Sequence, residues 1–108
     1  MRSGLKWDEH SYPIGNLLNS ITQMAASTDW IKFVLDQPMA VAPGTKPYYN
    51  SGCTILLSGV LAKVTGEQPA DYAKKYLLNK IGITNYEWEK GLQGITNTAW
   101  GLHMRPRD

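Results

Sequence analysis

The chain has 108 residues, which is enough for one small domain. Hydrophobic residues make up 43% of it, an ordinary share for a globular protein, and this composition excludes disorder. The 11 basic and 9 acidic residues are well mixed and give a net charge of +2. No Lys/Arg cluster of the kind that neutralises many phosphates is present, so nucleic acid is a poor candidate partner.

The sequence shows no membrane span and no targeting signal. No apolar run approaches the ~20 residues needed to cross a bilayer. The N-terminus lacks the apolar region of a signal peptide, although for a fragment this would say nothing of the parent protein. The single cysteine, Cys53, excludes an internal disulfide, and we expect it in the core. His10 and His103 lack partners at ligand spacing, so we expect no metal site.

The first half of the chain predicts loop followed by two short helices. Residues 1–15 contain glycine and proline among scattered polar groups and are expected to form loop. Apolar residues at helical spacing predict a helix over about 17–26. A second short helix is predicted over 29–36, with Thr28 as its N-cap and Pro38 beyond its end.

The strongest periodic signal runs from Ser51 to Gly66. We expect Ser51 to cap this helix and Gly66 to take the left-handed position after its end. Its predicted inward stripe has helical spacing and consists of Cys53, Leu56, Leu57, Val60, Leu61 and Val64.

A further helix is predicted over 69–80, with Pro69 at its first position. Its expected inward side consists of Tyr72, Ala73, Tyr76 and Leu77. Residues 83–102 predict loop with room for one short hairpin, and residues 106–108 resemble the first turn of another helix. The predicted fold is therefore mainly α, with three to four short helices around the central helix and little or no sheet.

Tyr49 and Ser51 stand two residues apart where the chain enters the central helix. A tyrosine is a poor base at its ordinary pKa of about 10. Cations and hydrogen bonds to the phenolate lower that pKa, and the phenolate then accepts a proton from a serine nucleophile. By spacing alone, the more frequent explanation is a packed surface tyrosine beside an N-capping serine.

Several segments match, in order and at similar spacing, the motifs of one family. They are Met1-Arg2-Ser3-Gly4-Leu5, Pro43-Gly44-Thr45, Tyr49-Asn50-Ser51, Leu56-Leu57-Ser58, Val64-Thr65-Gly66, and Gly101 through Asp108. Over nearly its whole length the chain resembles the serine β-lactamase and penicillin-binding-protein superfamily. Within it, the chain is most similar to the class C β-lactamase-like esterases, amidases and 6-aminohexanoate-dimer hydrolases. Their second motif is usually Tyr-x-Asn, and Tyr-x-Ser in the oligomer-hydrolase branch.

The adjacent Tyr48 leaves a second register open. Counting from Pro43-Gly44 and back from Leu56-Leu57 favours Tyr49 as the motif tyrosine. With Tyr48 the motif would read Tyr48-Tyr49-Asn50, the commoner Tyr-x-Asn form. The departure from asparagine at Ser51 leaves open which polar group contacts substrate.

The family's chemistry uses a serine nucleophile, a lysine one helical turn later, and the tyrosine, which passes the proton to the leaving group. Ser3 and Lys6 match Ser-x-x-Lys only as a string, because Gly4 and the nearby loop residues provide no helix to hold them on one face. No Lys-Thr-Gly or His-x-Gly motif is present, and Lys63 to Gly66 belongs to a helix end.

The resemblance implies that residues 1–108 form one helical subdomain of a β-lactamase/transpeptidase-like fold, truncated at both ends relative to a parent enzyme. It implies hydrolysis of an amide, lactam or ester of a small acyl substrate through an acyl-enzyme, with Tyr49 as general base and acid and Ser51 as a hydrogen-bonding partner. It implies no cofactor or metal. The parent would usually be periplasmic or at the cell surface, although some relatives stay in the cytoplasm.

The chain alone is expected to be inactive and, as a cut subdomain, to expose an apolar patch through which it self-associates. The alternative from another class is a free-standing helical protein-interaction module. Packing is the expected role of each tryptophan, although Trp7, Trp88 or Trp100 would be suited to wall a substrate cleft in the parent.

Overall fold

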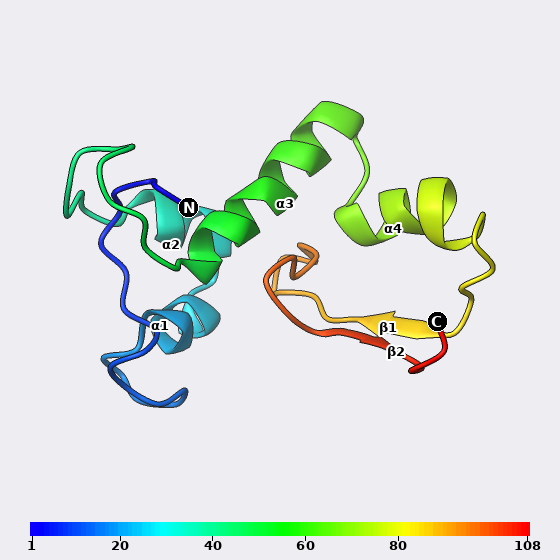
Figure 1. Ribbon diagram of the computed structural model, residues 1–108, viewed down its shortest axis with the longest axis horizontal. Coiled ribbons are helices and arrows are strands. Elements are labelled where there is room, and N and C mark those ends of the chain that lie inside the picture. Colours follow the sequence, from blue (N-terminus) through cyan, green and yellow to red (C-terminus); the bar gives the residue numbers. More distant parts are fainter. The chain divides into compact units, whose positions relative to one another are not determined.

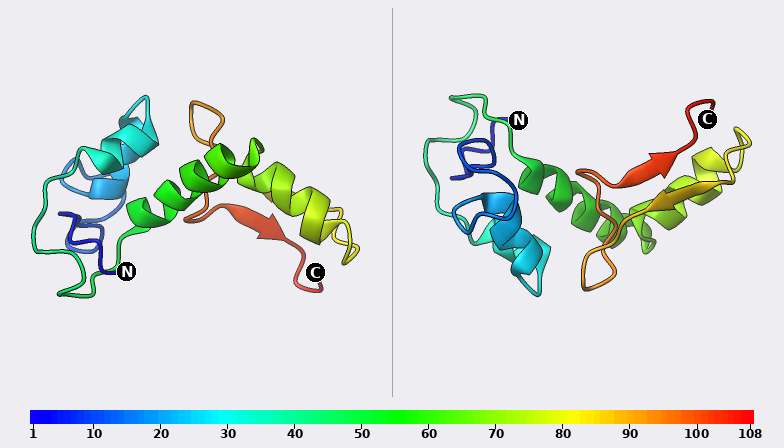
Figure 2. Two further views of the ribbon diagram at one scale, coloured as in Figure 1. Left: turned by 90° about the horizontal axis from the view of Figure 1, so that it is seen from above. Right: turned by 90° about the horizontal axis from the view of Figure 1, so that it is seen from below.

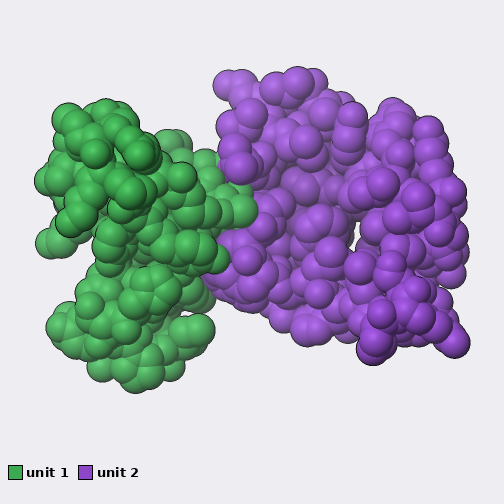
Figure 3. Space-filling model, in the orientation of Figure 1, with its two compact units in different colours: residues 1–56 green, residues 57–108 purple.

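The computed structural model describes residues 1–108, which divide into two compact units, residues 1–56 and 57–108 (Figure 3). The elements in chain order (Figure 1) are α1 (Ser20–Ala26), α2 (Trp30–Leu35), α3 (Ser51–Thr65), α4 (Pro69–Ala73), the π-helical turn η1 (Lys74–Leu78), β1 (Tyr86–Trp88) and β2 (Leu102–Met104). The prediction of a mainly helical chain with little sheet is confirmed. No helix is both long enough and apolar enough to span a bilayer.

In unit 1, the start of α1 is set by Asn19, whose side chain is wholly buried. Its Oδ1 accepts hydrogen bonds from the backbone N–H groups of Ile21 and Thr22 at 2.9 and 3.3 Å, which caps the helix. Its amide group donates to the carbonyl oxygens of Glu9 and Tyr12, at 3.3 and 2.7 Å. The helix therefore begins three residues later than predicted, and one side chain joins α1 to the loop of residues 8–13.

α2 packs near α1 and supplies part of the core of unit 1. Asp29, and not the predicted Thr28, is its N-cap, because the Asp29 carboxylate accepts the Lys32 backbone N–H at 2.9 Å. A carboxylate at this position also interacts favourably with the helix dipole. Met24 of α1 and Val34 of α2 have no exposed surface and form the centre of this core.

α3 runs from Ser51 to Thr65, as predicted, and Gly66 follows it with φ +74°. The prediction that Ser51 caps the helix is wrong. Asn50 does so, since its Oδ1 accepts the Cys53 backbone N–H at 3.0 Å. The Ser51 side chain is engaged elsewhere, in the contact that defines the candidate site.

The predicted inward stripe of α3 is wrong at three of its six positions. Leu57, Val60 and Val64 are 62%, 57% and 79% exposed, whereas Ile55 and Ser58 are wholly buried. The helix buries its small residues because they allow neighbouring parts of the chain to approach it closely. A Cβ on Gly52 would lie 2.8 Å from the Trp7 ring, and the Ser58 hydroxyl donates to the Thr96 carbonyl at 2.7 Å. Cys53, expected in the core, is only half-buried.

Unit 2 begins its second helix at Pro69, as predicted, with Gln68 as N-cap residue. The expected inward side is wrong at two positions, because Tyr76 and Leu77 are 45% and 53% exposed and Leu78 is buried. The cause is η1, in which the Asn79 N–H bonds to the Lys74 carbonyl at 3.1 Å. Each such five-residue step adds one residue to the turn, so the next inward-facing residue comes one position later in the sequence than in an α-helix.

Unit 2 contains a hairpin, although its second strand, Leu102–Met104, lies mostly beyond the range 83–102 in which a hairpin was predicted. β1 and β2 pair antiparallel, with Tyr86 opposite Met104 and Trp88 opposite Leu102. Both strands can be followed in Figure 1 and in the right-hand view of Figure 2. The Trp88 indole N–H donates to the Asn97 carbonyl at 2.7 Å and so ties the connecting loop to the hairpin. Residues 105–108 form a single turn.

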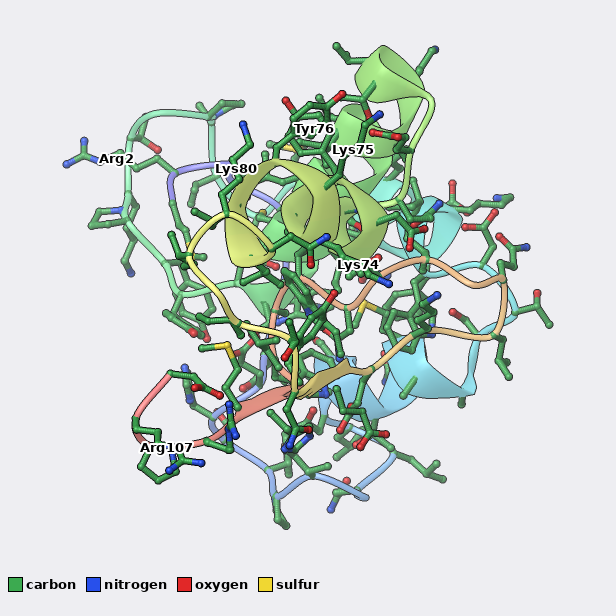
Figure 4. All side chains as sticks on the ribbon, turned by 90° about the vertical axis from the view of Figure 1, so that its right-hand side faces the viewer. Arg2, Lys74, Lys75, Tyr76, Lys80 and Arg107 are labelled. Atoms are coloured by element: carbon green, nitrogen blue, oxygen red, sulfur yellow. The ribbon has the colours of Figure 1, made fainter.

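The lysines of the α4–η1 helix project from it in different directions (Figure 4). Lys75 lies 4.8 Å from the centre of the Tyr76 ring and 3.1 Å from the Glu67 carboxylate. The hydrogen bonds that the Lys75 ammonium group donates to Tyr76 and Glu67 raise the pKa of Lys75. This basic side chain is thus paired within its own unit.

Candidate functional site

Tyr49 lies just before α3 in unit 1, and its side chain is 57% exposed. Together with Met1, Pro47 and Tyr48 it lines a shallow depression. The phenol therefore does not point into the apolar interior. Its ring lies 5.6 Å, between centres, from the imidazole of His10, with 50° between the two planes.

Ser51 is the first residue of α3, and only 6% of it is exposed. Its hydroxyl donates to Oε1 of Glu9 at 2.9 Å. Its backbone N–H donates to Oε2 of the same carboxylate, also at 2.9 Å. The single hydroxyl proton of Ser51 is thus committed to Glu9, which leaves only lone pairs for any other group.

Glu9 gathers three donors on one carboxylate. Besides the two from Ser51, the indole N–H of Trp7 donates to Oε2 at 2.5 Å. The carboxylate also sits at the N-terminus of a 15-residue helix, where the helix dipole favours a negative charge. Hydrogen bonds to a charged group of this kind are stronger than neutral ones, so the contact fixes the start of α3 to the loop of residues 7–9.

The next residues of the same loop carry His10 toward Tyr49. The Asp8 carboxylate accepts the backbone N–H groups of Ser11 and His10 at 2.9 and 3.2 Å. Hydrogen bonds from the Ser11 backbone and hydroxyl, followed by those from His10 and its charge, lower the pKa of Asp8 from its ordinary value of 3.8. This turn holds the imidazole in place beside the phenol.

Sequence reasoning missed Glu9 and His10 because they lie about forty residues before the tyrosine. The one available signal was the polar run Asp8-Glu9-His10 directly after a tryptophan. Nothing in the spacing shows that this run closes on the start of α3.

The expectation that no helix holds Ser3 and Lys6 on one face is confirmed, because residues 3–6 are not helical and Gly4 has φ +79°. The Ser3 oxygen instead accepts a hydrogen bond from the Cys53 thiol at 3.1 Å. The Lys6 backbone N–H donates to the Pro38 carbonyl at 2.7 Å. These two residues join the N-terminal segment to the rest of unit 1.

A second hollow in unit 1, of about 280 Å³, shares Tyr48 with the depression at Tyr49. Tyr48 lines both, and the wall of the hollow includes Trp7, Lys6 and Lys46. Tyr48 is 45% exposed, so that both adjacent phenols reach the surface and the structure favours neither register by exposure.

No group of three or more His, Cys, Asp or Glu side chains lies in an arrangement that could hold a metal ion. Nε2 of His103 lies 3.3 Å from the carboxylate of Glu89. Both side chains are exposed, on and beside the hairpin of unit 2.

Among protein families, the one described as Beta-lactamase matches residues 1–108, the whole chain. The fold and this match define a serine-hydrolase-like segment that is built mainly of helices. The chain belongs to the beta-lactamase family.

Proposed function

We propose that this chain is the helical part of a serine hydrolase that cleaves an amide, lactam or ester in a small acyl substrate. The observation that carries the proposal is an exposed phenol, Tyr49, held at the start of α3 in a chain that belongs to the beta-lactamase family. The Tyr-x-Ser form of the motif favours the branch of esterases and oligomer hydrolases.

In this proposal the nucleophilic serine and its lysine belong to polypeptide outside residues 1–108. The serine oxygen attacks the acyl carbon while Tyr49 takes its proton, and Tyr49 then protonates the leaving group as the old bond breaks. Water later attacks the acyl-enzyme, and the serine recovers its proton. Ser51 contributes to the same site as a hydrogen-bonding partner, and no metal or cofactor takes part.

The family is often periplasmic or secreted, and we propose the same for the enzyme that contains this chain; the alternative is a cytoplasmic location. Residues 1–108 are then one part of a larger hydrolase. The proposal concerns the complete enzyme, and this chain by itself is expected to be inactive.

The proposal is tested by comparing the complete reading frame with residues 1–108 in pre-steady-state hydrolysis of p-nitrophenyl esters. We expect the complete protein to release a burst of p-nitrophenol close to one equivalent of enzyme. The 108-residue chain should give none, since removing the nucleophile removes the covalent route. A stoichiometric burst from residues 1–108 would overturn the assignment of the nucleophile to other polypeptide.

The exposed stripe of α3 supports a covering layer outside this chain. Leu57, Val60 and Val64 lie at spacings of three and four residues, so they share one face of the helix. The same face would suit the alternative function, a helical protein-interaction module. A complete reading frame with an upstream Ser-x-x-Lys favours the hydrolase, whereas a frame that is complete at residues 1–108 favours the module.

We expect the isolated chain to self-associate through this stripe. Val60→Glu places a charge on it and should lower the sedimentation coefficient at high protein concentration toward the value of a monomer. Lys63→Glu, at an exposed polar position of the same helix, is the matched control and should leave association unchanged. A wild-type chain that stays monomeric at millimolar concentration would refute the expectation.

A further inference from the structure

We propose that Glu9 is a positioning residue for the catalytic tyrosine, an inference that rests on the proposed function. Its carboxylate contacts Ser51, and its backbone continues directly into His10, so Glu9 is joined to both parts of the candidate site. Through Ser51 it holds the first turn of α3, and Tyr49 precedes that turn by two residues. Through the peptide bond to His10 it sets the place of the imidazole that lies beside the Tyr49 ring.

The segment between these contacts has little freedom. Asn50 is 2% exposed, and its side chain caps α3 through the Cys53 N–H. The Asn50 backbone N–H lies 3.4 Å from the sulfur of Met1. With Asn50 and Ser51 both fixed, the direction in which Tyr49 leaves the helix is set by where Glu9 holds the helix start.

The charge of Glu9 also determines how the Ser51 hydroxyl is oriented. A carboxylate has no proton to give, so all three groups around it must donate. In Glu9→Gln the side-chain oxygen can still accept from Trp7 and from the Ser51 backbone. The new amide group then faces the Ser51 oxygen, and the hydroxyl must reverse and release its proton toward the site.

The kinetic experiment compares three variants in the complete enzyme, with a p-nitrophenyl ester as the probe. Glu9→Gln should lower kcat by about 10-fold or more and change KM little, because misplacing a proton-transfer group costs chiefly in the transition state. Asp36→Asn is the matched control, an exposed carboxylate of unit 1 that pairs with Lys32, and it should keep the wild-type kcat. Tyr49→Phe reports on the proposed function itself.

The outcomes separate the two claims. An active Glu9→Gln enzyme beside an inactive Tyr49→Phe enzyme would overturn the inference and leave the proposed function in place. An active Tyr49→Phe enzyme would overturn the proposed function, and the inference with it. Loss of kcat in Glu9→Gln and Tyr49→Phe, with Asp36→Asn unaffected, is the expected result.

A second measurement does not depend on activity. In the 108-residue chain, NMR hydrogen exchange of the Ser51 amide should speed up in Glu9→Gln, and the Trp7 indole proton resonance should move upfield. Both protons lie on the Glu9 carboxylate and lose its charge. Unchanged exchange and an unchanged indole resonance would show that Glu9 does not hold the helix start, whatever the kinetics.

Discussion

Replacing Tyr49 by phenylalanine should lower kcat/KM of the complete enzyme for an activated ester by about 10²- to 10⁴-fold, the usual contribution of a general acid–base group. The phenol is exposed, so the loss of one oxygen leaves the packing of unit 1 intact. The substitution removes only the group that we assign to proton transfer. Steady-state kinetics with p-nitrophenyl esters measures the effect, and an unchanged thermal midpoint shows that folding is not at fault.

Tyr48→Phe is the matched control, because it removes the same atom from the adjacent position. Tyr48 is exposed to a similar degree and borders the same depression. We expect this variant to remain within about threefold of wild type, since a surface hydroxyl without a chemical role contributes little. The reverse pattern, with Tyr48→Phe inactive and Tyr49→Phe active, would move the motif to Tyr48-Tyr49-Asn50.

The largest expected effect on stability belongs to Asn19→Ala. The substitution removes the N-cap of α1 and leaves the carbonyl groups of Glu9 and Tyr12 without the donor that they have now. Loss of a cap costs about 1 kcal/mol, and loss of the hydrogen bond to each of these two partly buried carbonyl groups costs about 1 kcal/mol. We therefore expect the free energy of unfolding to fall by about 3 kcal/mol, measured by urea denaturation of the 108-residue chain.

Asn16→Ala provides the matched control for this measurement. Asn16 is exposed, and its side chain accepts one backbone N–H, that of Leu18 at 2.9 Å. Its replacement should change the free energy of unfolding by about 0.5 kcal/mol or less. Equal effects of the two substitutions would contradict the role given to Asn19 in joining α1 to the loop of residues 8–13.

The helices were predictable from the sequence because their boundary residues act locally. Pro69 begins α4 and Gly66 follows α3 in the left-handed conformation, as expected. The N-cap residues were less predictable, since neighbouring polar residues are equally suited to the N-cap position. Asp29 and Asn50 cap α2 and α3, although Thr28 and Ser51 are also suitable by type.

The buried faces could not be read from hydrophobic spacing. α3 turns Ser51, Ile55 and Ser58 inward and exposes leucine and valine, because Trp7 and Thr96 approach the sides on which residues are small. Periodicity reports where apolar residues lie on a helix, and it does not report which of those faces the chain itself covers. In η1, one π-type step is enough to bury Leu78 in place of Leu77.

The candidate site was predictable only in part. The motif Tyr49-Asn50-Ser51 could be found from its spacing to Pro43-Gly44 and to the leucines of α3. The structure adds that the Ser51 hydroxyl donates its hydrogen bond to Glu9. No local sequence pattern indicates this contact. Long-range hydrogen bonds of this kind depend on how a loop closes, and they become visible only in the folded chain.

Mapping the acyl group in the complete enzyme tests the central claim most directly. The reaction is stopped during turnover of an ester whose acyl-enzyme is hydrolysed slowly. The enzyme is then digested and analysed by peptide mass spectrometry. We predict one acylated serine, in a Ser-x-x-Lys sequence outside residues 1–108, and no acyl group on Ser3 or Ser51. An acyl group within residues 1–108, or turnover without any acylated serine, would contradict the account.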